Sequence, residues 1–281
     1  MRNYLDALKF ILENGSDRKD RTGVGTRAVF GMQFRYDLSK GFPMVTTKKM
    51  PWKSVVSELL WFIEGSNDER RLAELLHGTR SPEKNTIWTA NANADYWKQK
   101  AKFPGDLGRV YGVQWRKWKS PEGNEIDQLA SAIEMIKKDP GSRRIIVNAW
   151  NPGELDRMAL PPCHTFFQFF VSEGRLSLQM FQRSCDMFLG VPFNIASYSL
   201  LLAMIAQVTG LAQGDFVHTL GDAHIYHNHF TQVEEQLKRE PLPLPTLWLN
   251  PGVRSIDDFK MEDIRLDNYQ SHPAIRADMA V

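Results

Sequence analysis

Two short segments of the chain carry residues that could do nucleophilic chemistry: LPPCH at positions 160–164 and QRSCD at positions 182–186. The thiol of Cys163 would react as a thiolate, which a nearby arginine or protonated histidine favours. The two segments contain one of each, Arg183 and His164. A cysteine by itself is usually a small buried hydrophobe, and we keep that interpretation for Cys185. For Cys163, the stiff prolines before it and the neighbouring cation favour a nucleophile.

Four arginines in special positions could bind a dianionic phosphate. Arg21 lies in a glycine-rich loop, Arg143 and Arg144 begin a predicted strand, and Arg183 ends another. The guanidinium fork matches phosphate geometry, and the hydroxyl of Ser184 could add a donor. Most arginines are instead solvated surface residues, and spacing alone does not show whether these four converge.

Two further side chains each have a structural and a chemical interpretation. Glu58 has apolar helical neighbours, so its carboxyl either escapes to solvent or is desolvated, with a raised pKa suited to general acid–base work. Asn194 lies just before a predicted helix, where Asn is a preferred N-cap. Its amide, with one donor and one acceptor face, could instead recognise a ligand that offers the complementary pair.

The histidines around position 227 raise the question of a metal. His224, His227 and His229 are spaced i, i+3 and i+5, which fits no standard zinc pattern, and no cysteine or acidic cluster accompanies them. We therefore expect no metal. The loop Gly23-Val24-Gly25 is neither a Walker loop nor a full dinucleotide fingerprint, so it is weak evidence by itself.

Hydrophobic periodicity predicts the elements that must position these residues. Helices are expected around 5–12, ending at Gly15; from Pro51 to Gly65; around Ile126, Leu129, Ile133 and Ile136; and over 195–208, an all-round apolar stretch that should be buried. Strands are expected over 28–34, 145–150, 165–171 and 175–183, the last two forming a hairpin. A loop is expected over 17–26, and a variable surface region over 75–106.

The order of these elements predicts one α/β domain of the α+β type over residues 1–281, with a mixed sheet packed by helices around the long buried one. The 281 residues are 42% hydrophobic and 24% charged, which is typical of a soluble globular protein. With 35 basic and 33 acidic residues, the formal charge of +2 argues against a dedicated nucleic-acid binder. Two cysteines, no apolar run near the ~20 residues of a membrane span and no signal peptide indicate a cytoplasmic protein.

Taken in order, these residues closely resemble the thymidylate synthase family, from Asp20 to Val281. The markers are DRTG at 20–23, ELLWF at 58–62, VYG at 110–112, SRRII at 142–146, PCH at 162–164, QRSCD at 182–186, PFN at 192–194 and GDAHIY at 221–226. Several such strings in the family's order are far more specific than any one motif.

The resemblance implies methylation of dUMP at C5, with 5,10-methylenetetrahydrofolate supplying the carbon and the reducing equivalents and leaving as dihydrofolate. Cys163 would add as a thiolate to C6 of the uracil, and Arg183 would lower the pKa of that thiol. The phosphate ligands would be Arg21, Arg183 and Ser184, joined by Arg143 and Arg144 of a partner subunit. The expected enzyme is therefore a homodimer.

The resemblance also implies how the base and the sugar are recognised. Asn194 would pair with N3–H and O4 of uracil, a pattern that cytosine reverses. His224 and Tyr226 would hold the sugar 3′-hydroxyl. Asp186 matches the family's pterin-binding carboxylate and borders the dUMP site.

On the folate side, Glu58 resembles the general acid–base centre, acting through ordered water, with Tyr111 and His164 in the surrounding proton-transfer network. The apolar folate wall would consist of Ile87, Trp88, Leu160, Gly190 and Phe193. The C-terminal residues 279–281, Ala280 included, would close over the site and exclude water.

Some positions depart from the family pattern. Arg109 stands where proline is usual, Thr89 follows Trp88 where aspartate is common, and the segments 78–85 and 92–104 look longer than in compact bacterial members. These positions lie near the folate-side loops, so we expect differences there rather than at the nucleotide site.

Three other functions compete with this interpretation. A dUMP hydroxymethylase on the same scaffold would capture the methylene intermediate with water; Trp88 and the hydrophobic C-terminus favour reduction instead. A non-catalytic RNA-binding regulator is disfavoured by the near-neutral charge and the full set of candidate catalytic residues. A Cys–His hydrolase would need contact between Cys163 and His164, but adjacent strand residues point to opposite faces.

Overall fold

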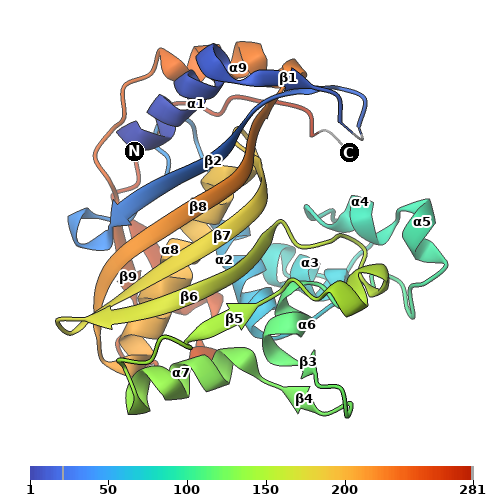
Figure 1. Ribbon diagram of the computed structural model, residues 1–281, viewed down its shortest axis with the longest axis vertical. Helices are drawn as coiled ribbons and strands as arrows, with labels where there is room; N and C mark the ends of the chain where they lie inside the picture. Colours follow the sequence, from blue (N-terminus) through green and yellow to red (C-terminus); the bar gives the residue numbers. More distant parts are fainter. Residues whose placement is uncertain (21, 280–281) are drawn as a thin grey trace.

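The computed structural model describes residues 1–20 and 22–279, and within them the largest feature is a mixed sheet of six strands (Figure 1). In spatial order, these are β1 (Ser16–Arg18), β2 (Thr26–Asp37), β8 (Ala212–Tyr226), β7 (Arg175–Asp186), β6 (His164–Ser172) and β5 (Ile146–Asn148). Neighbouring strands are antiparallel except for β7 and β8, which are parallel. The predicted α/β fold with a mixed sheet is confirmed.

Helix α8 (Gly190–Thr209) lies behind the sheet in Figure 1 and packs on β7 and β8. The sheet covers one side of α8 and helix α2 (Trp52–Ile63) contacts another, so side chains such as Leu200 and Ile205 are fully buried. A helix enclosed in this way needs no polar stripe, which explains why its sequence is apolar nearly all round. The predicted buried helix over 195–208 is confirmed, and it begins at Gly190.

By length and composition alone, α8 is apolar enough to cross a membrane, although most of it is buried inside the protein. The sequence was expected to contain no apolar run of this length; Asn194, Ser197 and Ser199 lie among the apolar residues of this helix. Since the sheet and α2 already cover the helix, its hydrophobicity is that of a core helix.

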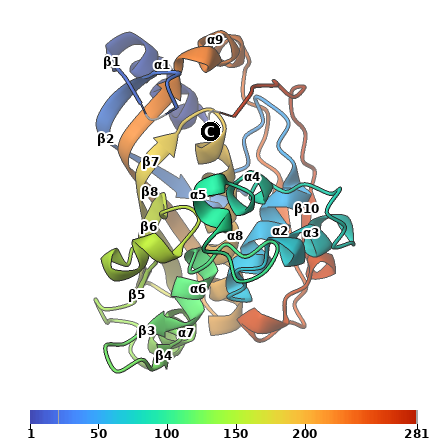
Figure 2. The same cartoon turned by 90° about the vertical axis from the view of Figure 1, so that its right-hand side faces the viewer.

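The other helices and the two small hairpins surround this core. The α-helices are α1 (Arg2–Asn14), α3 (Glu69–His77), α4 (Thr89–Ala92), α5 (Asp95–Lys98), α6 (Tyr111–Arg116), α7 (Gln128–Lys138) and α9 (Phe230–Leu237). The 3-10 helices are η1 (Leu38–Lys40), η2 (Pro152–Arg157), η3 (His227–His229), η4 (Ile256–Asp258) and η5 (Met261–Asp263). The hairpins pair β3 (Trp118–Lys119) with β4 (Glu125–Ile126), and β9 (Thr246–Leu249) with β10 (Ile264–Asp267). In Figure 2, α3, α4 and α5 lie on the same side of the sheet as α2.

Several local predictions are confirmed. α1 ends at Gly15, although this residue is extended, with a φ of −73°, instead of left-handed. β6 and β7 form the predicted hairpin, and its two turn residues, Glu173 and Gly174, have φ values of 51° and 71°. Two successive positive φ angles are the mark of a type I′ turn, whose twist matches that of the strands.

Two local predictions are wrong in part, and a third is incomplete. The expected loop over 17–26 begins with β1, because the backbone of residues 16–18 pairs with the edge of β2. Ile126 belongs to β4 and not to a helix: Asp127 accepts a hydrogen bond from the N–H of Ala130, and this N-cap starts α7 two residues later. The predicted variable surface region over 75–106 is largely exposed or half-buried, but Trp88 and Trp97 are buried in it.

Candidate functional site

The register of the sheet brings the candidate residues of three strands to one end. β6 starts where β7 finishes, so His164 lies opposite Gln182, and the backbone N–H of Arg183 donates to the carbonyl of Cys163 at 2.8 Å. β8 runs parallel to β7 and ends at the same place, with Asp186 opposite His224. Residues far apart in the sequence therefore meet through backbone pairing alone.

Cys163 is half-buried immediately before β6, and its backbone N–H donates to the hydroxyl of Tyr111 at 2.7 Å. Burial raises the pKa of the Cys163 thiol, whereas the charge of Arg183 and hydrogen bonds with Tyr111 and Ser184 lower it. Arg183 thus acts in the expected direction, but desolvation is the larger effect and the net pKa is raised. The thiol is protonated at neutral pH in the ligand-free protein.

Arg183 is held against the segment that carries the nucleophile. Its Nε donates to the carbonyl of Pro162 at 2.8 Å, and its Nη2 donates to the carbonyl of Pro161 at 3.0 Å. The guanidinium also lies over the ring of Trp150, 5.1 Å from its centre. The same side chain therefore fixes the backbone before Cys163 and places a positive charge beside the thiol.

His164 is not the cation that the sequence suggested. Its buried ring stacks on Tyr111 with 4.0 Å between the ring centres, and Nδ1 lies 2.6 Å from the hydroxyl of Tyr198. Burial lowers the pKa of His164 to about 3, with a further contribution from His218, so the ring is neutral. It can take part in a hydrogen-bonded network, but it cannot supply charge to Cys163.

Glu58 projects from α2 and meets Trp88, whose indole Nε1–H donates to Glu58 Oε1 at 2.7 Å. Burial of the carboxyl raises the pKa of Glu58 to about 7, and the hydrogen bond from Trp88 works against that rise. A carboxyl with this pKa exists in both protonation states near neutral pH. Glu58 can therefore accept and return a proton there.

The amide of Asn194 does not cap a helix, contrary to one of its two interpretations. α8 already begins at Gly190, because Asp186 Oδ1 accepts the backbone N–H groups of Phe188 and Leu189, each at 3.0 Å, and turns the chain into the helix. Asn194 therefore lies in the second turn, where its side chain makes no hydrogen bond to residues 1–20 or 22–279. A Cβ placed on Gly190 would lie 3.6 Å from Asp186 Cβ and 3.8 Å from Asn194 Oδ1, so the two side chains border the same space.

His224 and Tyr226 end β8 beside this space. Their rings meet edge to face, 5.2 Å apart and at 87°. His224 Nδ1 lies 3.1 Å from a carboxylate oxygen of Asp222, which fixes the ring, and Ser184 is the β7 neighbour of Asp222. Two candidate sugar ligands and one candidate phosphate ligand thus lie at the same end of adjacent strands.

Some candidates are not brought together within this chain. Arg21 and Ala280 lie outside the described residues. Arg143 and Arg144 are exposed in the turn between α7 and β5, and neither guanidinium forms a hydrogen bond or ion pair with any residue in the described ranges. Two uncompensated cations at one edge of the sheet remain available to another molecule.

The candidate folate residues differ in burial. Trp88 is buried, Leu160, Gly190 and Phe193 are half-buried, and the side chain of Ile87 is largely exposed. Leu160 lines a cavity of about 580 Å³ with Tyr96 and Pro161 among its walls. An apolar surface therefore borders the end of the sheet that carries Cys163.

Two further residues of the site were not predicted from the sequence. Tyr198 of α8 hydrogen-bonds His164, and Lys48 is buried with its Nζ donating to the carbonyl of Phe188, near Asp186. Burial lowers the pKa of Lys48 to about 7. A polar side chain inside an apolar stretch must find a partner, so a tyrosine in a fully buried helix was the available signal for Tyr198.

Within residues 1–20 and 22–279, no group of three or more His, Cys, Asp or Glu side chains is placed to hold a metal ion. A family model described as Thymidylate synthase matches residues 2–281, nearly the whole chain. The protein is therefore an enzyme of the methyltransferase class. The chain belongs to the thymidylate synthase family, whose reaction is the methylation of dUMP with a folate co-substrate, and the resemblance seen in the sequence is confirmed.

Proposed function

We propose that this enzyme, acting as one catalytic domain over residues 1–281, converts dUMP to dTMP with 5,10-methylenetetrahydrofolate as carbon donor and reductant, through a covalent bond from Cys163 to C6. The observation that carries this proposal is the placement of the Cys163 thiol beside Arg183, with Tyr111 and Ser184 as hydrogen-bond partners. A nucleophile, a cation and two hydroxyl groups meet there.

The first step is addition of the Cys163 sulfur to C6. The S–C6 bond forms, the C5–C6 π electrons move to C5 and O4, and the thiol proton leaves to solvent or a neighbouring hydroxyl. Because the pKa of the thiol is raised in the free protein, the positive charge of Arg183 is needed to stabilise the developing thiolate. The carbonyls of Pro161 and Pro162 keep that guanidinium in place.

The folate supplies a one-carbon unit that bonds to C5 and the hydride that reduces it to methyl, while C5 loses a proton and the S–C6 bond breaks. Removal of the C5 proton needs a base that works near neutral pH. Glu58 has a pKa raised to about 7 by burial, which suits it to accept and release that proton through water. Tyr111, which accepts the backbone N–H of Cys163, and the neutral His164 stacked on it are proposed to join this proton transfer.

Two observations support binding of a folate at this end of the sheet. Asp186 uses Oδ1 for backbone N–H groups, and its Oδ2 has no hydrogen bond from the described residues, so it can accept one from a pterin. Leu160 and Phe193, both half-buried, provide apolar surface for the aromatic rings. The side-chain chemistry present therefore fits the co-substrate.

Asn194 is proposed to recognise the base. Its amide makes no hydrogen bond to the described part of the chain, so both its donor and its acceptor can pair with O4 and N3–H of uracil. Cytosine reverses that pattern, and a mismatch leaves unsatisfied groups at about 1–3 kcal/mol each. His224 and Tyr226, at the end of β8, are proposed to hold the sugar.

We further propose a homodimer in which Arg143 and Arg144 bind the phosphate in the partner's site. The sheet face away from α8 carries large exposed aromatic side chains, with Phe30 at 87% and Phe170 at 65% exposure. Exposed apolar surface of this kind marks an interaction site. The same face has a groove of about 450 Å³, lined by Phe170, Gln179 and Arg35, into which side chains of a second copy could pack.

Subunit mixing tests the shared site. Neither Cys163→Ala nor the double variant Arg143→Ala/Arg144→Ala should turn over alone. After exchange, half of the dimers are hybrids with one complete site each, so about one quarter of the wild-type activity should return. A mixture that exchanges subunits, as mass spectrometry shows, yet stays inactive would place these arginines in their own subunit's site.

The proposal as a whole is tested by mass analysis of the nucleotide after incubation with dUMP and methylenetetrahydrofolate, with dihydrofolate followed in the same tube. Thymidylate with an equal amount of dihydrofolate is the expected result. Hydroxymethyl-dUMP with tetrahydrofolate would replace the reductive step by capture with water. No nucleotide product at all would overturn the catalytic proposal.

A further inference from the structure

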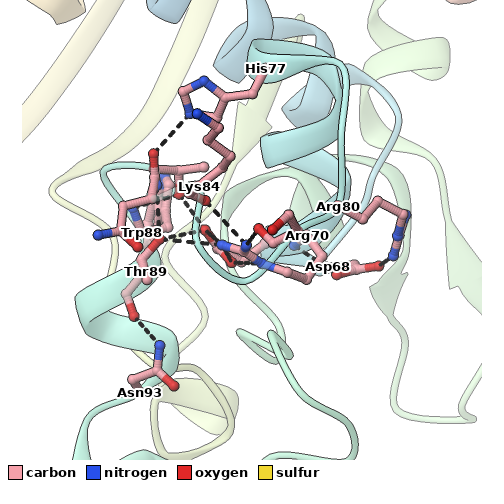
Figure 3. A network of polar contacts seen from close by, with 12 residues as sticks. Asp68, Arg70, His77, Arg80, Lys84, Trp88, Thr89 and Asn93 are labelled. Carbon is pink, nitrogen blue, oxygen red and sulfur yellow. Dashed lines mark hydrogen bonds and ion pairs between the residues drawn. The ribbon is translucent and has the colours of Figure 1, made fainter.

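A partly buried polar cluster, formed by Glu69, Arg70, Thr86 and Thr89, lies beside Trp88 (Figure 3). Glu69 begins α3 and is 1% exposed. Its carboxylate accepts hydrogen bonds from Thr86 Oγ1 and Thr89 Oγ1, both at 2.6 Å, and from Arg70 Nε at 2.6 Å. We refer to these four residues as the Glu69 cluster.

The Glu69 cluster fixes the backbone on both sides of Trp88. Thr89 Oγ1 accepts the backbone N–H of Thr86 at 2.8 Å, and Thr86 Oγ1 accepts the backbone N–H of Trp88 at 3.1 Å. Each hydroxyl donates its proton to the carboxylate and accepts a hydrogen bond from the chain. The segment 86–89 is therefore tied to Glu69 through both hydroxyls.

Arg70 also holds the residues just before the segment 86–89. Its Nη1 donates to the carbonyls of Ser81, at 2.6 Å, and Lys84, at 3.1 Å. His77 Nε2 lies 2.9 Å from the carbonyl of Asn85, and Asn93 Nδ2 donates to the carbonyl of Thr89 at 2.9 Å; Figure 3 shows both contacts at the rim of the cluster. An irregular stretch is thereby attached to α3 at several points.

The position of this backbone decides where the indole N–H of Trp88 lies. The ring is buried against Trp61 and Tyr111, each 5.8 Å away between ring centres, and a large planar side chain so enclosed has few alternative rotamers. Nε1–H then meets Glu58 Oε1 at 2.7 Å. A shift of the 86–89 backbone would lengthen that hydrogen bond directly.

We propose that the Glu69 cluster consists of positioning residues that hold the Trp88 N–H on the carboxyl of Glu58 and thereby set the protonation equilibrium of Glu58. The effect on turnover rests on the proposed function, whereas the effect on the titration of Glu58 does not. Thr89, which departs from the family pattern, has a specific task in this arrangement: its one hydroxyl joins Glu69 to the backbone of Thr86.

Among the groups around Glu58, Trp88 is the one whose hydrogen bond can change the pKa of the carboxyl. Tyr198 of α8, Tyr111 of α6 and His164 of β6 are titratable side chains packed against this part of α2. Helix α3 also packs on α2, and its charged Glu69 and Arg70 form an ion pair with each other. Burial raises the pKa of both tyrosines and lowers that of His164, so all three are neutral near pH 7. The hydrogen bond from Trp88 favours the ionised carboxylate, and its loss must raise the pKa of Glu58 further.

The test uses Thr89→Val, which keeps the shape of the side chain and removes its hydroxyl. Glutamate labelled with 13C at the carboxyl reports the titration of Glu58, whose signal is assigned by its loss in Glu58→Gln. The midpoint should rise by about one pH unit in Thr89→Val, since a hydrogen bond to a charged group is lost or lengthened. Thr89→Ser, which retains the hydroxyl, should restore it, and the acid limb of kcat against pH should move with the midpoint.

Thr79→Val is the matched control, because Thr79 Oγ1 lies in the neighbouring stretch and only accepts the N–H of Ser81. Its Glu58 midpoint should equal that of the wild type. An unchanged midpoint in folded Thr89→Val, or an equal rise in Thr79→Val, would overturn the proposal.

If Thr89→Val does not fold, Thr86→Ala gives the same test through the other hydroxyl. A wild-type enzyme without activity, combined with the expected shift, would remove the proposed function and leave the cluster's role in place.

Discussion

The two sides of the candidate site are built in different ways. The proposed nucleotide side consists of the ends of β6, β7 and β8, where Cys163, Arg183 and His224 are placed by backbone pairing. The proposed folate side depends on the largely irregular stretch 78–94, where the Glu69 cluster and other side-chain hydrogen bonds hold Trp88 against Glu58. Backbone pairing therefore holds the strand ends in place when Cys163 or His224 is changed, although the side chain of Arg183 also holds the segment before Cys163. In the irregular stretch, by contrast, a single hydroxyl is proposed to control the geometry of Glu58.

Cys163→Ala, on the strand-end side, is expected to have the largest effect on turnover. Because the sheet register does not depend on this side chain, turnover should fall by about four to six orders of magnitude, while dUMP still binds. Steady-state assays and calorimetric titration with dUMP measure the two effects. Cys185→Ala is the matched control: that thiol is buried and donates to the carbonyl of Gln182 at 3.2 Å, so its loss should lower stability and not chemistry. A Cys163→Ala enzyme that keeps substantial activity would contradict the covalent mechanism.

Glu58→Gln tests the acid–base role proposed for the side of the site that contains Trp88. Turnover should fall by about two to four orders of magnitude, as expected for loss of a general acid–base group. With the Glu58 pKa raised to about 7, the wild-type rate should increase with pH through that value as the carboxylate forms, and the variant should lack this limb.

The same substitution has a stability consequence whose sign follows from linkage. The folded-state pKa of Glu58 lies above the unfolded value of about 4.3, so folding is favoured below about 4.3 and that advantage is lost as the pH rises through about 7. The difference in melting temperature between Glu58→Gln and wild type should therefore be more positive at pH 8 than at pH 4. Melting curves at the two pH values measure it, and an equal difference at both would show that the carboxyl is not desolvated.

Asn194→Asp is expected to have the smallest effect, because it changes recognition and leaves both catalytic groups in place. The preference for dUMP over dCMP in kcat/KM should fall by about 10- to 100-fold, since one mismatched hydrogen-bond pair is relieved for cytosine and created for uracil. Competition assays with both nucleotides measure the ratio. A preference equal to that of the wild type would exclude Asn194 as the group that recognises the base.

Local patterns in the sequence predicted much of the fold. The apolar stretch around 195–208 predicted a buried helix, and the residues around 172–174 predicted the turn of a hairpin, because both signals lie within a few neighbouring residues. The wrong predictions concern boundaries set by distant or unexpected partners. β1 exists because β2 offers an edge, and α8 begins before Asn194 because Asp186 turns the chain into it.

The candidate site shows the same division. Residue types and family motifs identified Cys163, Glu58 and Trp88 as chemical groups, but the region 75–106 carried no periodicity from which burial could be predicted. The hydrogen bond from Trp88 to Glu58 joins positions 30 residues apart, and the Glu69 cluster that supports it combines a helix start with an irregular stretch. Neither has a signal in local sequence.

By itself, the sequence determined the family, the chemical inventory and the main core elements, because these depend on which side chains are present and on how apolar residues repeat. Only the tertiary structure decided the protonation states. His164 is neutral, Cys163 is a thiol and Glu58 is balanced near pH 7 because desolvation and hydrogen bonding depend on what surrounds each group in space. Those surroundings come from strands and helices that are distant along the chain.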